Sequence, residues 1–152
     1  MKKLFVLCMV FVFSFCSYSV SFAETTTEDV IEALKLAYSE AFDYCETRYN
    51  ADDSTLIVDV AIDGFAQIMY QAKENGVEST DETWNQLKGI FLAAYYGSVS
   101  MFETCEIETP KHIHLQLWND DVVIRNDHST GKSRILLAIQ NGYFYIDEME
   151  SY

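Results

Sequence analysis

The sequence is poor in the residues that separate a chain into modules. Proline occurs once, at Pro110, and only 6 of the 152 residues are glycine. No stretch rich in Pro, Gly or Ser divides the chain, and it contains no internal repeat or low-complexity tract. Beyond the first 23 residues, the sequence therefore predicts a single domain, residues 24–152, long enough to bury an ordinary core.

Basic side chains are also few. The chain has 10 Lys and Arg against 24 Asp and Glu, which gives a formal net charge of −14 at pH 7. Residues 24–110 hold 18 acidic and 4 basic side chains, so the charge is concentrated before the last third. Such a field repels nucleic acid and anionic lipid surfaces and favours encounters with basic proteins. We expect no nucleic-acid partner, although solubility after export explains the same charge without any partner.

Motifs for catalysis or cofactor binding are missing. No serine lies in a Gly-x-Ser-x-Gly turn. Asn50–Ser54 does not match an EF-hand loop, which needs alternating oxygen ligands, a central Gly and a closing Glu. Gly131–Ser133 has the residues that end a phosphate-binding loop, but it falls in an expected hairpin instead of between a strand and a helix. Asp59 and Asp63, four residues apart, are typical of a solvated helix stripe. We expect no cofactor.

The first 23 residues have the pattern of a secretory signal peptide. Lys2 and Lys3 form a basic start, Leu4–Ser14 is apolar, and Ser21–Ala23 provides a small-x-small cleavage site. Serines interrupt the apolar run, which disfavours a retained membrane anchor. We therefore predict an exported protein, periplasmic or secreted, with no membrane segment after cleavage.

Apolar residues at helical spacing predict three helices: about 27–48, 54–75 and 80–104. The first opens on a capping box within Thr25–Asp29. The second is apolar nearly all round, which is typical of a central helix, and Gly76 stops it. The third ends before Pro110, because proline cannot continue a helix.

The last third predicts an antiparallel meander with four strands: about 111–118, 121–127, 132–140 and 143–148. Asn141-Gly142 is the strongest turn signal, because a type I′ turn needs positive φ at both central residues. Turns at Asn119-Asp120 and His128–Gly131 complete the meander. Together the three turns place one apolar set on one face: Ile113, Leu115, Leu117, Val122, Ile124, Ile135, Leu137, Ile139, Phe144 and Ile146. The predicted fold class is α+β, a three-helix layer packed on one face of this C-terminal four-stranded antiparallel β-meander.

The second face of the predicted meander mixes aromatic, aliphatic and charged side chains, a composition that does not suit bulk water alone. We interpret it as covered by a protein partner, a second copy or a ligand. The alternative is cover by the C-terminal residues or by part of the helical layer. The expected interaction residues are His112, His114, Trp118, Arg125, Arg134, Tyr143 and Tyr145.

His112 and His114 share one face of their predicted strand, a spacing that suits a metal ion, and the expected register brings Asp127 opposite His112. Arg125 falls opposite His114 with Arg134 next to it, however, and two cations disfavour a third. Ordinary exposed histidines are therefore the preferred interpretation. The remaining alternative is an anion-binding patch formed by His114, Arg125 and Arg134.

Cysteine is scarce after the signal segment, where only Cys45 and Cys105 occur. In an up-down-up arrangement the first and third helices are parallel, so both cysteines would reach the same end of the helical layer. In an oxidising compartment we predict a disulfide between them. A thiol catalyst would instead need a histidine beside the thiolate, and all three histidines lie in the predicted sheet region.

Two functional classes remain open. The first is a non-enzymatic exported domain that binds a basic protein, for example to neutralise a toxin or hydrolase, or that associates with itself through the outer sheet face. The second is a small-ligand-binding protein or hydrolase-like enzyme with a pocket between helices and sheet, which would be favoured if Asp59, Asp63 or Tyr70 lined a cavity. Small size, acidity, the predicted disulfide and the lack of a catalytic set favour the first class.

Overall fold

The computed structural model describes residues 25–77, 79–127 and 134–149. The predicted signal peptide, residues 1–23, lies outside them. In chain order the elements are α2 (Thr27–Ala41), β1 (Tyr44–Asn50), β2 (Thr55–Ala61), α3 (Phe65–Glu74), α4 (Ser79–Thr104), β3 (His112–Trp118), α5 (Asp120–Val123), β4 (Ile135–Gln140) and β5 (Tyr143–Asp147). Within the described ranges, no helix has the length and apolar composition needed to cross a bilayer.

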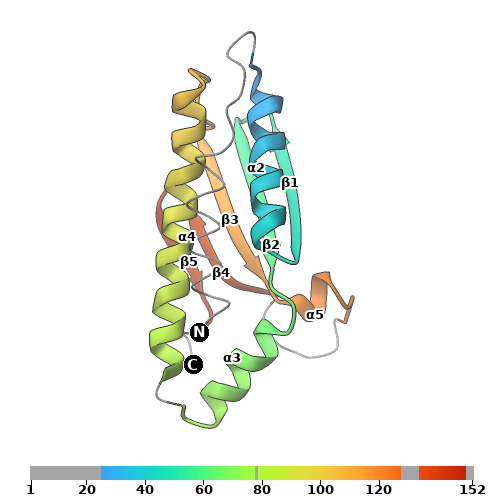
Figure 1. Cartoon of the computed structure of the whole chain (residues 1–152), viewed down its shortest axis with the longest axis vertical. Helices are drawn as coiled ribbons and strands as arrows, with labels where there is room; N and C mark the ends of the chain where they lie inside the picture. The colour runs from blue at the N-terminus through green and yellow to red at the C-terminus, as the bar shows by residue number, and fades with distance from the viewer. Residues whose placement is uncertain (1–24, 78, 128–133, 150–152) are drawn as a thin grey trace.

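The five strands form one sheet in the order β1-β2-β3-β4-β5. β2 and β3 are parallel, and the other neighbours are antiparallel. A parallel pair cannot be closed by a tight turn, so the chain crosses from β2 to β3 through α3 and α4 (Figure 1). The fold is therefore mixed α+β, as predicted, but its sheet has five strands and is not a simple meander.

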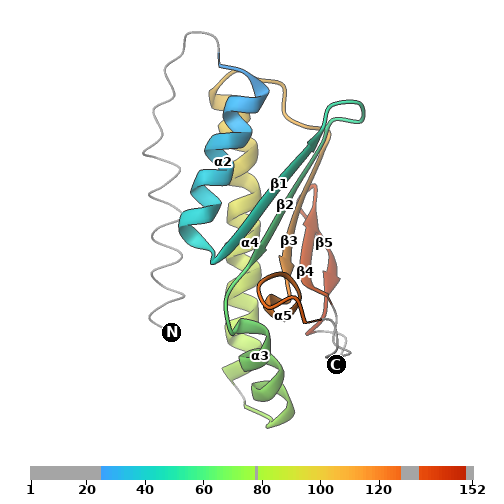
Figure 2. The ribbon, with the colours of Figure 1, turned by 90° about the vertical axis from the view of Figure 1, so that its right-hand side faces the viewer.

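The helices α2 and α4 lie side by side on one face of the sheet, and α3 and α5 sit at one end of it (Figures 1 and 2). The core fills the space between this helical layer and the sheet. Its largest fully buried side chains come from both layers: Leu34, Tyr38, Leu56, Tyr70, Leu87, Phe91, Phe102, Ile113, Leu115, Leu117, Leu136 and Leu137. No helix of the described residues covers the other face of the sheet (Figure 2).

Polar contacts fix the start of α2 and join α2 to α4. The predicted capping box at the start of α2 is confirmed, because the hydroxyl of Thr26 accepts from the backbone N–H of Asp29 while the Asp29 carboxylate accepts from that of Thr26. Further along α2, the hydroxyl of Tyr38 lies 2.8 Å from that of Ser98 on α4. Burial raises the pKa of Tyr38, so its hydroxyl stays protonated.

One carboxylate fastens α4 to the far strand of the sheet. Asp147 of β5 accepts from the indole of Trp84 at 2.7 Å and pairs with the ammonium of Lys88 at 2.6 Å. Residues 143, 145 and 147 would share one face of a regular strand. The register shift opposite Ala138 and Ile139 turns Asp147 towards the helices, which leaves Tyr145 on the other face.

The first predicted helix is too long. α2 ends at Ala41, and residues 44–50 form strand β1. Phe42 already has extended backbone, and the residues that follow include Tyr44, Thr47 and Tyr49, which favour strands. Phe42 and Cys45, which continue the helical spacing of apolar residues, therefore lie beyond the end of the helix.

The second predicted helix, residues 54–75, is wrong over its first half. Residues 55–61 form β2, and only Phe65–Glu74 is helical, followed by Gly76 with φ of 62°. β2 lies between β1 and β3, and its successive residues Val58, Asp59 and Val60 are all buried. Apolar residues on both faces of this strand give a nearly continuous apolar run, which from the sequence looks the same as an all-round apolar helix.

The third predicted helix and most of the last third are confirmed. α4 spans Ser79–Thr104, and β3, β4 and β5 lie within the ranges predicted for them. The Asn141-Gly142 turn has positive φ at both residues, 48° and 83°, as a type I′ turn requires. The pairing of Gln140 with Tyr143 and Ile139 with Phe144 is also confirmed.

The predicted strand 121–127 is wrong. Asp120–Val123 forms the short helix α5, whose cap is Asn119, so Asn119-Asp120 is not a hairpin turn. β3 therefore pairs directly with β4, with Leu117 opposite Leu137. The predicted turn at His128–Gly131 lies in residues 128–133, outside the described part of the chain.

Candidate interaction face

The sheet surface opposite the helices is the candidate functional site, and we call it the open face. The strand register places one row of side chains across all five strands: Arg48, Ile57, His114, Gln140 and Tyr143. The neighbouring positions on the same face are Tyr44, Glu46, Thr55, Asp59, His112, Gln116, Trp118 and Tyr145. The alternate residues of the same strands, such as Leu56 and Ile113, are buried under the helices.

Five of the seven predicted interaction residues lie on the open face: His112, His114, Trp118, Tyr143 and Tyr145. Tyr143 is 79 % exposed and Tyr145 is 47 % exposed. The sequence located these residues because the periodicity of β3 and the turn before β5 fixed which side chains share a face. The other two predicted residues, Arg125 and Arg134, lie outside the strands of the sheet.

A small hydrogen-bonded group occupies the centre of the open face. The hydroxyl of Tyr145 accepts from the side-chain amide of Gln116 at 2.9 Å and lies 3.3 Å from Nδ1 of His114. The rings of His114 and Tyr145 meet edge to face, with their centroids 5.9 Å apart. Burial, and to a lesser degree the neighbouring His112, lowers the pKa of His114, so its ring is neutral at pH 7.

A second group surrounds a buried carboxylate. Asp59 is only 4 % exposed, yet it lies on the open face of β2. One of its oxygens accepts from the indole N–H of Trp118 at 3.0 Å, and the other binds the guanidinium of Arg48 on β1. A buried charge needs such partners, because leaving it unpaired costs several kcal/mol. The contact therefore holds the Trp118 ring in one orientation across the neighbouring strand.

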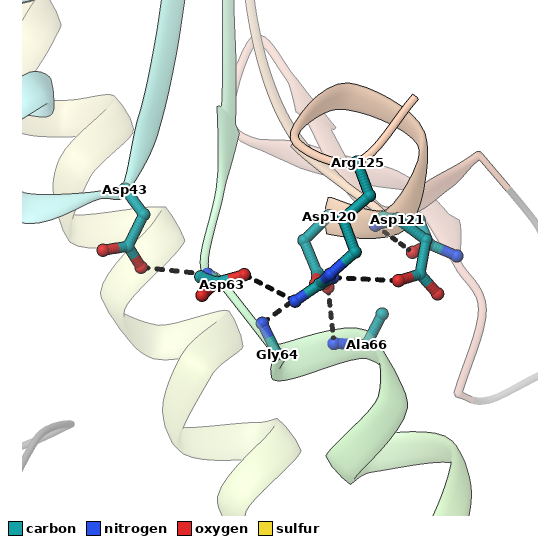
Figure 3. Close-up of polar contacts among 8 residues, drawn as sticks. Asp43, Asp63, Gly64, Ala66, Asp120, Asp121 and Arg125 are labelled. Carbon is teal, nitrogen blue, oxygen red and sulfur yellow. Dashed lines mark hydrogen bonds and ion pairs between the residues drawn. The ribbon is translucent and has the colours of Figure 1, made fainter. Parts of the chain in front are cut away.

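Arg125 does not reach the open face. Its guanidinium binds three carboxylates at the α3 end of the sheet: Asp120, Asp121 at 2.8 Å and Asp63 at 2.6 Å (Figure 3). The predicted anion-binding patch is therefore not assembled, because acids already surround Arg125. Arg134 lies just before β4 with its side chain exposed, and its carbonyl accepts from the backbone of Asn119 at 2.8 Å.

Asp120 organises that cluster and caps a helix that is distant in sequence. It is 1 % exposed, and its carboxylate accepts from the backbone N–H groups of Gly64 at 2.9 Å and Ala66 at 3.0 Å, at the start of α3 (Figure 3). Gly64 itself offers no side chain for this cap. Burial opposes the charge on Asp120, but the hydrogen bonds from Arg125, Ala66 and Gly64 outweigh it and lower the pKa of the carboxyl.

The predicted metal candidate formed by His112, His114 and Asp127 is wrong. His112 begins β3 beside Thr55, whereas Asp127 follows α5 beyond the other end of that strand. Its premise was the strand at 121–127, which does not exist. In the described residues, no group of three or more His, Cys, Asp and Glu side chains is placed to hold a metal ion.

The predicted disulfide is not formed, because Cys45 and Cys105 are both free thiols in the structure. Cys45 lies on β1 opposite Val60, near the end of β2 that leads to α3. Cys105 follows α4, and the chain then enters the sheet at the opposite end, where the backbone of Lys111 bonds to Ser54. The prediction assumed that Cys45 ends a helix parallel to α4, and that helix stops at Ala41.

The residues that would have favoured a pocket between helices and sheet do not meet there. Asp59 faces the open side, and Asp63 belongs to the Arg125 cluster. Tyr70 is buried on α3. The sequence did not reveal that Asp120 caps α3. The one available signal was Gly64, which stands at the N-cap of α3 and has no side chain that could cap the helix.

Comparison of the chain with protein-family models, with curated proteins and with solved structures found no match. The functional argument therefore depends on the geometry and charge of the open face.

Proposed function

We propose that this protein is an exported, non-enzymatic binding domain that holds a basic protein partner on its open face. One observation carries the proposal: within the described residues, helices cover one face of the sheet, and the other face presents exposed tyrosines beside side chains held by hydrogen bonds. Inhibition or neutralisation of a basic protein in the same compartment is the role that fits this arrangement.

The side chains of the open face suit protein recognition. Tyrosine and tryptophan are enriched at interfaces because they bury a large area while losing little conformational freedom. Tyr145 and Trp118 are already oriented by Gln116 and Asp59. Binding then requires less ordering of these two rings, which leaves more of the contact energy for affinity.

The charge of the protein selects the partner. Four basic side chains, Arg48, Lys73, Lys88 and Arg125, form salt bridges within the protein itself. The remaining acidic excess, a formal net charge of −14 for the whole chain, gives the protein an acidic field. Such a field increases the rate of encounter with a basic protein and rejects acidic ones.

Capture at low ionic strength tests the proposal. The purified protein is immobilised and exposed to a periplasmic or secreted-protein extract, and bound proteins are eluted with a salt gradient. We expect one basic protein, stoichiometric with the immobilised chain, to elute as salt rises, because screening weakens electrostatic capture. Retention of no protein, or of one whose binding is insensitive to salt, would contradict the proposal.

A further inference from the structure

β1 is an edge strand with little protection against pairing. Its seven residues pair with β2 without a register shift, from Tyr44 opposite Ala61 to Asn50 opposite Thr55. It lies at one edge of the sheet, with β2 on one side only (Figure 1). Natural edge strands are usually protected by proline, charged side chains (lysine above all), a bulge or short length. β1 has seven residues without proline, lysine or a bulge, and its charged side chains are Glu46 and Arg48, whereas the other edge, β5, has five residues and a register shift.

Glu46 on β1 stands beside another acidic side chain within the sheet. Glu46 stands directly opposite Asp59 on β2, and like charges at opposed positions are destabilising. Arg48 binds Asp59, but its side chain remains 54 % exposed. On its other side Glu46 faces the open edge, where a cation at the opposed position of another strand would offset the repulsion.

We propose that two copies of this protein pair antiparallel through β1, with the two-fold axis at Thr47. In this register Glu46 stands opposite Arg48 of the partner subunit, and the symmetry repeats the pair. On the helix side, Cys45 stands opposite Tyr49 of the partner subunit, and both side chains are partly buried against the core. The second copy thus supplies, from the same seven residues, a cation opposite Glu46, in addition to the hydroxyl of Tyr44, which donates to the Glu46 carboxylate at 2.8 Å.

Other registers are less favourable. An axis at Glu46 would place the two glutamates opposite each other, and an axis at Arg48 would do the same to the arginines. An axis between two residues would turn one copy over, so that its open face would continue the helix side of the other copy. Only the axis at Thr47 pairs both charges and keeps the two faces continuous. The result is one sheet with two copies of the open face side by side, which goes beyond the proposed function.

The mass in solution and two charge reversals test this dimer. Light scattering and sedimentation should give twice the mass of one chain. Glu46→Lys should weaken dimerisation by roughly tenfold, because it replaces two attractive cross-strand pairs with two repulsive ones. Glu103→Lys is the matched control, since it makes the same charge change on α4, which packs over β3 and β4. It should leave dimerisation unchanged or strengthen it slightly by reducing the net negative charge.

A crosslink locates the axis. Thr47→Cys should form a covalent dimer under mild oxidation, with the bond mapped to position 47 in both chains by mass spectrometry. A single-chain mass at every concentration, or equal weakening by Glu46→Lys and Glu103→Lys, would overturn the inference. So would a crosslink confined to other positions. Wild type should capture the basic partner on its open face whether it sediments as one chain or as two, so failure of the dimer is distinguishable from failure of the proposed function.

Discussion

Replacing Asp120 by alanine is expected to lower the free energy of unfolding by about 2–4 kcal/mol, because the change removes a helix cap and leaves hydrogen-bond donors without an acceptor. The carboxylate is 1 % exposed and serves two structures at once. It binds the guanidinium of Arg125 and accepts from the first N–H groups of α3 through Gly64 and Ala66. Removing it leaves both sets of donors without this acceptor.

Asp121→Ala is the matched control for this prediction. Asp121 contacts the same guanidinium at 2.8 Å, but its side chain is 23 % exposed and makes an i, i+4 pair on a short helix. Its loss should cost about 1 kcal/mol or less. Urea unfolding monitored by fluorescence measures both variants. Equal effects of the two substitutions would show that Asp120 does not cap α3.

The carboxyl group of Asp120 also makes the stability of the fold depend on pH. Because the pKa of Asp120 is lowered in the folded protein, its contribution to stability is fully present above the pKa of the unfolded state. It is lost as pH falls through the lower, folded-state pKa. Wild type should therefore lose more stability than Asp120→Asn when pH is lowered from neutral to below 4. Asp29, whose pKa the backbone of Thr26 lowers, is unchanged in both proteins.

Phe91→Ala should destabilise the protein by about 3–5 kcal/mol, the usual cost of removing a phenylalanine from a core. Phe91 is fully buried on α4, and its ring meets that of Phe42 edge to face at 6.0 Å, where α2 ends. Leu36→Ala on α2 is the control, because Leu36 is 51 % exposed and should lose about 0.5 kcal/mol or less. Urea denaturation compares the two. A loss below about 1 kcal/mol for Phe91→Ala would contradict the packing of α4 against α2.

Local signals predicted the parts of the fold in which one pattern allows one structure. α4 has a long amphipathic pattern that ends before Pro110, and the turn at Asn141-Gly142 requires the positive φ that these two residues tolerate. The faces of β3 and of the first half of β5 followed from that turn, whereas the register shift places Asp147, and not the predicted Ile146, opposite Leu137. This is why most of the open face, including His114, Trp118 and Tyr145, was predicted correctly as one surface.

The middle of the chain could not be predicted from periodicity. In Thr55–Ala61, which forms β2, the apolar run is nearly continuous, because Leu56, Val58 and Val60 on the helix side alternate with Ile57 and Ala61 on the open face. Such a run is compatible with a buried helix as well. Its β-branched residues, including Ile57, Val58 and Val60, favoured a strand, but only the pairing with β3 across more than 50 residues decides between the two.

Two further errors concern the predicted disulfide and Arg125. The disulfide depended on a helix that continued through Cys45, and that segment is β1. Arg125 was assigned to a strand because Val122 and Ile124 alternate with other residues, but the carboxylate of Asp120 is needed at the start of α3 and brings this segment there as α5. Tertiary contacts of this kind have no local sequence signature.

The central claim is that the open face holds the partner, and the affinity of the captured protein for matched variants tests it most directly. The double variant Tyr143→Ala with Tyr145→Ala removes both exposed rings without touching the core, and Leu36→Ala removes an exposed side chain from the helical layer. Calorimetry at fixed salt should show the double variant binding at least about tenfold more weakly than wild type, as truncation of central interface tyrosines usually does. Leu36→Ala should bind like wild type. Unchanged affinity of the tyrosine variant, or a loss confined to Leu36→Ala, would place the partner on the helical layer and contradict the account.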